Sequence, residues 1–167
     1  VETVYFSAPT CYPDREVNGR NHVTKAADAM ELFVQLFKRM SDLSPELAKA
    51  HAITWPETDK YFFRKLKLFA LAQDHVFDAA DASSAVLSLD QECFWHSGVV
   101  RELLFLLADR WVDFSPEHRA LITERILTGP DKPPNCTDDE YASKKDTFSA
   151  RYGRYLELQG CVLSKEH

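Results

Sequence analysis

The sequence predicts an all-α fold, a helical-repeat array of the HEAT-like α-solenoid type with about seven helices. Three observations lead to this prediction. The 167 residues contain only five Gly and are 45% hydrophobic, with eleven Phe, six Tyr and three Trp available to fill a core. Apolar residues recur at the spacing of one helical face along most of the chain. Finally, one stretch of the sequence matches another.

Residues 1–23 are expected to form an extended arm in front of a helical-repeat domain that covers residues 24–167. The arm contains Pro9, Pro13 and Gly19 and shows no helical period. Aromatic side chains are expected to anchor it on the helices, namely Tyr5, Phe6 and Tyr12.

Four helices are predicted in the first unit of the domain, near residues 24–90. Thr24 is expected to cap a helix that ends near Met40. The run Ser44-Pro45-Glu46 predicts the next start, because it combines a capping hydroxyl, a first-turn proline and a first-turn acid. Two further helices are expected at residues 58–73 and 74–89, the latter with a break near Asp81-Ala82-Ser83.

Three helices are predicted in the second unit, near residues 91–167. The first runs from Ser97 to Phe114 and is apolar around most of its circumference, so we expect neighbours on most sides. Ser115-Pro116-Glu117 starts the second, which stops before a Pro-rich loop at residues 129–139. The last covers residues 139–159, with Gly160 as its C-terminal cap.

The strongest organisational signal is a match between residues 31–46 and residues 102–117. The segments read ELFVQLFKRMSDLSPE and ELLFLLADRWVDFSPE, and eight of the sixteen positions are identical. Chance is one explanation, because Ser-Pro-Glu is a common helix start and Leu is abundant. We interpret the match as a repeated helix–turn–helix unit. A weaker echo between residues 64–68 and 154–158 predicts that a third unit begins after Gly160.

Several stretches also resemble a known group of proteins. They read RELLFLLADRW, DFSPEHR, RILTGP and RYLELQG, within about residues 59–163. They resemble the helical C-terminal regions of large bacterial proteins that carry sirtuin-like or NTPase effector domains and are linked to anti-phage defence. The resemblance implies a sensor or scaffold region whose enzymatic chemistry lies in other domains. It carries no catalytic residue onto this chain.

The net charge and the N-terminal sequence bear on the partners and the compartment that we expect for this protein. Twenty basic and 26 acidic residues give a net charge of −6, which disfavours general adhesion to nucleic acid or anionic membrane. No apolar run approaches the roughly 18 residues that span a bilayer, and the start is not a signal peptide. We therefore expect a cytoplasmic protein with reduced cysteines. The missing initiator Met suggests a piece of a longer reading frame.

Two constellations were weighed for chemistry. Glu102, Asp109 and Asp113 share a helical stripe that suits metal binding or acid–base work, but Lys38 replaces Asp109 in the matching segment, which predicts a solvated edge. Cys93 and His96 could form a nucleophilic pair or half a zinc site, but without a second Cys/His cluster a packed turn is preferred. Phosphate-binding and hydrolase motifs are absent from the sequence. We therefore predict no catalytic, cofactor-binding or metal-binding residue and no enzyme.

Two functions remain. The leading expectation is a non-catalytic protein-interaction scaffold, because stacked helix pairs make extended binding surfaces. Its partner would be a phage protein or another subunit or domain of the same assembly. The alternative is a nucleic-acid-binding module, based on a basic patch interleaved with aromatic residues. The patch comprises Lys60, Arg64, Lys65 and Lys67. The same residues are more typical of the outer face of an amphipathic helix.

Overall fold

All regular structure in the described part of the protein is helical. The computed structural model describes residues 10–12, 15, 25–56 and 62–163, and these contain no strand. The prediction of an all-α fold is therefore confirmed. In chain order the helices are α1 (Lys25–Leu43), α2 (Pro45–Ile53), α3 (Phe62–Leu71), α4 (Ala79–Ser88), α5 (Gln91–Trp95), α6 (Val100–Arg110), the 3-10 helix η3 (Trp111–Asp113), α7 (Pro116–Thr128) and α8 (Asp138–Leu158).

The two Ser-Pro-Glu runs both start helices, as predicted, but only one serine acts as a side-chain cap. The Ser115 hydroxyl accepts a hydrogen bond from the His118 N–H at 3.1 Å, whereas Ser44 makes no such bond. Sequence reasoning missed the caps of α4 and α5, where the carboxylates of Asp78 and Asp90 accept from backbone N–H groups. Gly160 follows the last helix with a φ of 82°, which suits its predicted role.

Three predicted boundaries in the middle of the chain are wrong. Residues 74–77 form turns because Asp78 caps the helix, and α4 then continues unbroken through the break expected near residue 81. The turn expected at Cys93 is the five-residue helix α5, which the count of seven helices lacked. The helix expected to reach Phe114 ends at Arg110 and tightens into η3. Thr24 lies outside the described residues.

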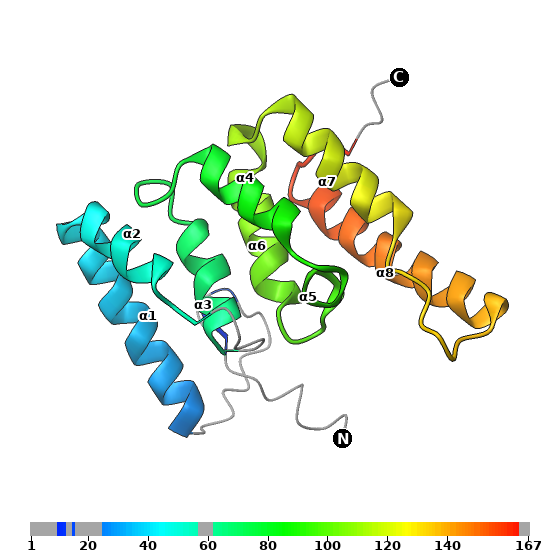
Figure 1. The fold of residues 1–167 in the computed structure, drawn as a ribbon. Helices are drawn as coiled ribbons and strands as arrows, with labels where there is room; N and C mark the ends of the chain where they lie inside the picture. The colour runs from blue at the N-terminus through cyan, green and yellow to red at the C-terminus, as the bar shows by residue number, and fades with distance from the viewer. Residues whose placement is uncertain (1–9, 13–14, 16–24, 57–61, 164–167) are drawn as a thin grey trace.

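The helices pack in two rows (Figure 1). In one row α3 packs against α6, and α6 packs against α8. In the other row α4 packs against α7, which also contacts α8. Helices α1 and α2 pack on each other at one end of the molecule, and α7 and α8 lie at the opposite end. Helix α1 reaches the first row through Phe37, whose ring centroid lies 6.2 Å from that of Phe69 in α3.

The end of the molecule at α8 is held by a buried aromatic group. Tyr152 of α8 lies 5.7 Å from Phe94 and 4.7 Å from Trp95, centroid to centroid, and its hydroxyl donates to the Phe94 carbonyl at 2.6 Å. The guanidinium of Arg125, on α7, lies 4.1 Å from the centroid of the Phe94 ring. It also donates to the Leu89 carbonyl at the end of α4. The short helix α5 is thus fixed by residues of α7 and α8.

Part of the N-terminal arm docks between α3 and α6. The Tyr12 ring packs edge-on against Phe69 and Phe105, which confirms it as an aromatic anchor. Arg15 lies over Phe105 and donates to Asp109 at 2.7 Å. Tyr5 and Phe6, the other predicted anchors, lie outside the described residues.

None of the helices described is long and apolar enough to cross a membrane. The four cysteines are free thiols, of which Cys136 is the one that is not buried. Burial raises the pKa of the thiols of Cys11, Cys93 and Cys161.

We therefore expect a disulfide reagent to modify Cys136 first. The other thiols are covered, and burial raises their pKa, so they should react on the order of 100-fold more slowly, at the rate of local opening. Mass spectrometry of briefly labelled protein measures the order, and Cys136→Ser should remove the fast phase. Fast labelling of Cys11 would show that the arm is not docked as described.

Candidate functional site

The predicted basic patch does not form one surface. Lys60 lies outside the described residues. Arg64 and Lys67 are half-buried on one side of α3, but Lys65 is only 2% exposed because successive helical residues point about 100° apart. The expectation that Lys65 joins an exposed patch is wrong.

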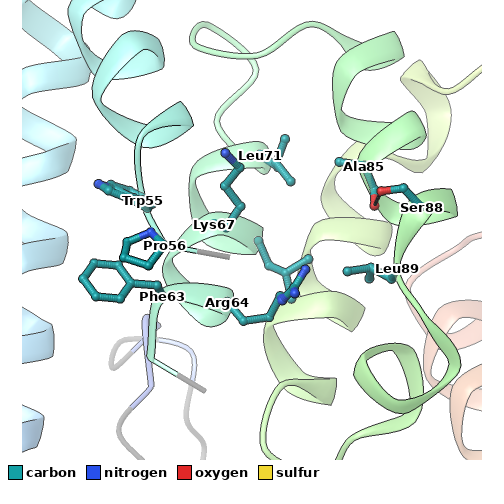
Figure 2. Close-up of a pocket in the computed structure, with 10 residues that line it drawn as sticks. Trp55, Pro56, Phe63, Arg64, Lys67, Leu71, Ala85, Ser88 and Leu89 are labelled. Atoms are coloured by element: carbon teal, nitrogen blue, oxygen red, sulfur yellow. Dashed lines mark hydrogen bonds between the residues drawn. The ribbon is translucent and has the colours of Figure 1, made fainter. Parts of the chain in front are cut away.

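Arg64 and Lys67 instead line a small pocket between the end of α2, helix α3 and the end of α4 (Figure 2). Trp55, Pro56 and Phe63 form one wall in Figure 2, and the end of α4 forms the facing wall. The pocket has a volume of about 80 Å³, whereas small-molecule sites usually measure roughly 300–1,000 Å³. The Lys67 ammonium donates to the Ala52 carbonyl at 2.9 Å, near the C-terminal end of α2. The pocket is therefore too small to enclose a cofactor, and one of its cations stabilises a helix end.

Each acidic residue of the stripe on α6 and η3 contacts another part of the chain. Glu102 is fully buried and accepts from the Cys11 N–H at 3.2 Å, so the predicted solvated edge is wrong at this residue. Asp109 pairs with Arg15 of the arm, and Asp113 pairs with Arg110 at 3.0 Å. Among the described residues, no three or more His, Cys, Asp or Glu side chains are grouped to hold a metal ion.

Cys93 and His96 do not have the environment of a nucleophilic pair. Burial, together with the Asp90 side chain, raises the pKa of the Cys93 thiol. The Nδ1 atom of His96 accepts a hydrogen bond from the Gly98 N–H at 3.0 Å. A thiolate nucleophile needs a lowered pKa and an adjacent base, so these residues are better explained by the packing of α5.

The structure does bring together one serine–histidine pair that the sequence did not suggest. The Ser83 Oγ lies 2.6 Å from His118 Nδ1 and also donates to the Ala79 carbonyl at 2.7 Å. The direction of the Ser83–His118 bond depends on the imidazole tautomer, and the hydroxyl is also held by a backbone carbonyl of its own helix. Ser83 is also fully buried. The pair joins α4 to α7, and no spacing motif signals it because the residues are 35 positions apart.

The most unusual surface is a stripe on the outside of α1. It comprises Leu32, Leu36, Arg39 and Leu43, spaced four, three and four residues apart as along a helix–helix seam. The three leucines are 57%, 59% and 77% exposed. We call these four residues the α1 outer face. Figure 1 shows α1 at the edge of the molecule, with its other side toward α2 and α3.

The matching segment, on α6 and just after it, has the same residue at three of the four positions and Phe in place of the fourth, Leu43, and there the stripe is buried. The counterparts of the α1 outer face are all less than 5% exposed: Leu103, Leu107, Arg110 and Phe114. Arg110 donates to two carbonyls at the end of α3 and in the turn that follows it. The opposite side of each helix faces the next helix in the row, through Phe37 toward α3 and through Phe105 toward α8. The α1 outer face therefore corresponds to the side of α6 that packs on the preceding helix.

Comparisons with protein-family models, with curated proteins and with solved structures give no match to this chain. Its function must therefore be argued from its own residues.

Proposed function

We propose that this chain is a non-catalytic protein-interaction module, a scaffold or sensor region of a larger bacterial protein, built as successive units of an α-solenoid. The two rows of helices support the solenoid arrangement, since stacked helix pairs contact mainly their neighbours. The resemblance to helical regions of anti-phage defence proteins favours a phage protein, or another part of the same assembly, as the partner.

The observation that carries the proposal is the α1 outer face. Scattered surface leucines are ordinary, but three on one helical stripe form a contiguous apolar surface of the kind that marks interaction sites. Arg39 lies between Leu36 and Leu43, and exposed charges of both signs flank the leucines, Glu31, Lys38 and Asp42. An apolar centre with a polar rim is the usual anatomy of a protein interface. A nucleic-acid function is less well supported, because Lys65 is buried.

The test is site-specific crosslinking in bacteria that produce the full chain, with and without phage infection. A photoreactive phenylalanine derivative replaces Leu36 or, as a matched control, the 45%-exposed Leu121 of α7. We expect a discrete protein adduct from position 36, at about ten times the yield from position 121. Equal yields at the two positions, or no adduct at position 36 in either culture, would contradict the proposal.

A further inference from the structure

The stripe on α6 is buried against other parts of the chain, whereas the α1 outer face is exposed. The surroundings of the α6 stripe therefore indicate what kind of partner fits the α1 outer face. We propose that the α1 outer face binds a helix that ends opposite Arg39 in a turn, offers backbone carbonyls to that guanidinium and carries a basic residue opposite Glu31. The inference rests on the proposed function and adds the identity of the binding element. It follows from the α3–α6 interface, because α1 carries on its outer face three of the four residues that α6 buries on its corresponding side.

The apolar part of the interface is set by the shared leucines. Leu103 and Leu107 of α6 are fully buried, and they lie on the side of α6 from which Arg110 reaches the end of α3. Leu32 and Leu36 occupy the equivalent positions and are more than half exposed. Covering both would remove apolar surface from water at about 25 cal/mol per Å², which is the main source of affinity in a helix-on-helix contact. The occupant must therefore present an apolar helical stripe.

The centre of the interface is set by the shared arginine. The Arg110 guanidinium donates to the Leu71 carbonyl, at the end of α3, and to the Phe77 carbonyl, both at 3.1 Å. It also donates to Asp113 at 3.0 Å, three residues on. Arg39 has the same partner in sequence, Asp42, at the same spacing. A guanidinium that becomes buried must keep its hydrogen bonds, so the occupant has to supply carbonyls in the way that the end of α3 does.

The edge of the interface is set by charge. Glu102, the counterpart of Glu31, and Lys65 of α3 are both buried, and Glu102 accepts from the Cys11 N–H at 3.2 Å. Burial raises the pKa of the Cys11 thiol, and the nearby charges of Glu102 and Lys65 act on it in opposite directions. The α3–α6 interface thus brings an acid of α6 and a base of α3 into one buried region. Glu31 is exposed at the edge of the α1 outer face, on the same flank as Lys38 and Asp42, so a basic residue placed opposite Glu31 fits this edge and an acidic one is repelled.

The segment that covers α6 provides the probe. A fluorescent peptide of residues 62–78 contains the apolar stripe, the basic residues and the terminal turn of the proposed partner. A peptide of the same composition in scrambled order is its control. Binding to the full chain is followed by anisotropy at low salt. We expect the native-order peptide to bind at least about tenfold more tightly than the scrambled one.

Variants of the full chain locate the binding. The pair Leu32→Gln and Leu36→Gln should weaken binding by about tenfold or more, and Arg39→Met by about threefold to tenfold. The matched pair Leu121→Gln and Leu127→Gln, on exposed leucines of α7, should change nothing. Binding that survives Leu32→Gln with Leu36→Gln, or that equals binding of the scrambled peptide, would overturn the inference.

Two further outcomes separate this inference from the proposed function. If position 36 crosslinks a protein but the peptide neither binds nor competes with it, the α1 outer face is an interaction site for a different element and the inference fails alone. If light scattering shows a dimer that Leu36→Gln abolishes, the occupant is a second copy and the inference also fails. If the photoreactive residue at position 36 gives no protein adduct, both the proposed function and this inference fail.

Discussion

Replacing Arg110 with Met is expected to lower the free energy of unfolding by about 3 kcal/mol, while the same change at Arg39 should alter it by less than about 0.5 kcal/mol. Arg110 is 4% exposed, and its guanidinium satisfies the carbonyls of Leu71 and Phe77. Methionine fills similar space without donating, so both carbonyls lose their donor in a buried region. Each such loss costs about 1–3 kcal/mol.

The comparison uses two arginines in matching sequence surroundings. Arg39 is exposed, so water replaces any bond that it loses. Urea unfolding of the two variants measures the difference, which should also appear as a fall in melting temperature of roughly 9 °C for Arg110→Met. Equal effects of the two substitutions would mean that the matching stripes do not differ in burial, and the argument for the α1 outer face would fall with them.

The helices were predictable where local chemistry decides the outcome. Ser115-Pro116-Glu117 places a cap, a fixed φ and an acid at a helix start, and all three act within a few residues. Gly160 ends α8 because its φ of 82° suits glycine. The start of α4 was less predictable, because an Ala/Ser-rich run does not mark its own first residue, whereas the carboxylate of Asp78 caps the helix.

The burial of charged residues was not predictable in the same way. Glu102 is covered because Cys11 donates to it from 91 positions away, and Lys65 lies in the same region. Helical periodicity places each residue on a side of its own helix, but it cannot tell which sides other segments cover. The predicted solvated edge failed at Glu102, and the predicted basic patch failed at Lys65, for this shared reason.

The sequence contains the spacing of the residues in the α1 outer face but does not reveal their exposure. The match between residues 31–46 and 102–117 contains three residues of the stripe, because Leu, Leu and Arg recur at the same spacing, but the sequence predicted a repeated unit and not a binding surface. The match treats its two copies as equivalent, however, and so cannot show that α6 has a neighbour on that side while α1 does not. That difference depends on where each helix stands in the row, which is a property of the packed chain.

Replacing Leu107 with Ala is expected to lower the free energy of unfolding by about 3–5 kcal/mol, whereas Leu36→Ala should cost less than about 0.5 kcal/mol. Leu107 is fully buried, so its loss removes transfer free energy and leaves a cavity between packed helices. Leu36 is 59% exposed, and its removal takes little apolar surface out of the core. Urea unfolding at matched protein concentrations measures both values.

The same pair of variants separates folding from binding. If the α1 outer face serves a partner, Leu36→Ala should leave stability unchanged and weaken partner binding, because an exposed leucine at the centre of an interface acts only in the complex. Leu107→Ala should do the reverse while the protein remains folded. A Leu36→Ala variant that unfolds as easily as Leu107→Ala would show that Leu36 already has a partner within the chain. A stripe that is covered within the folded chain cannot be free to receive another helix.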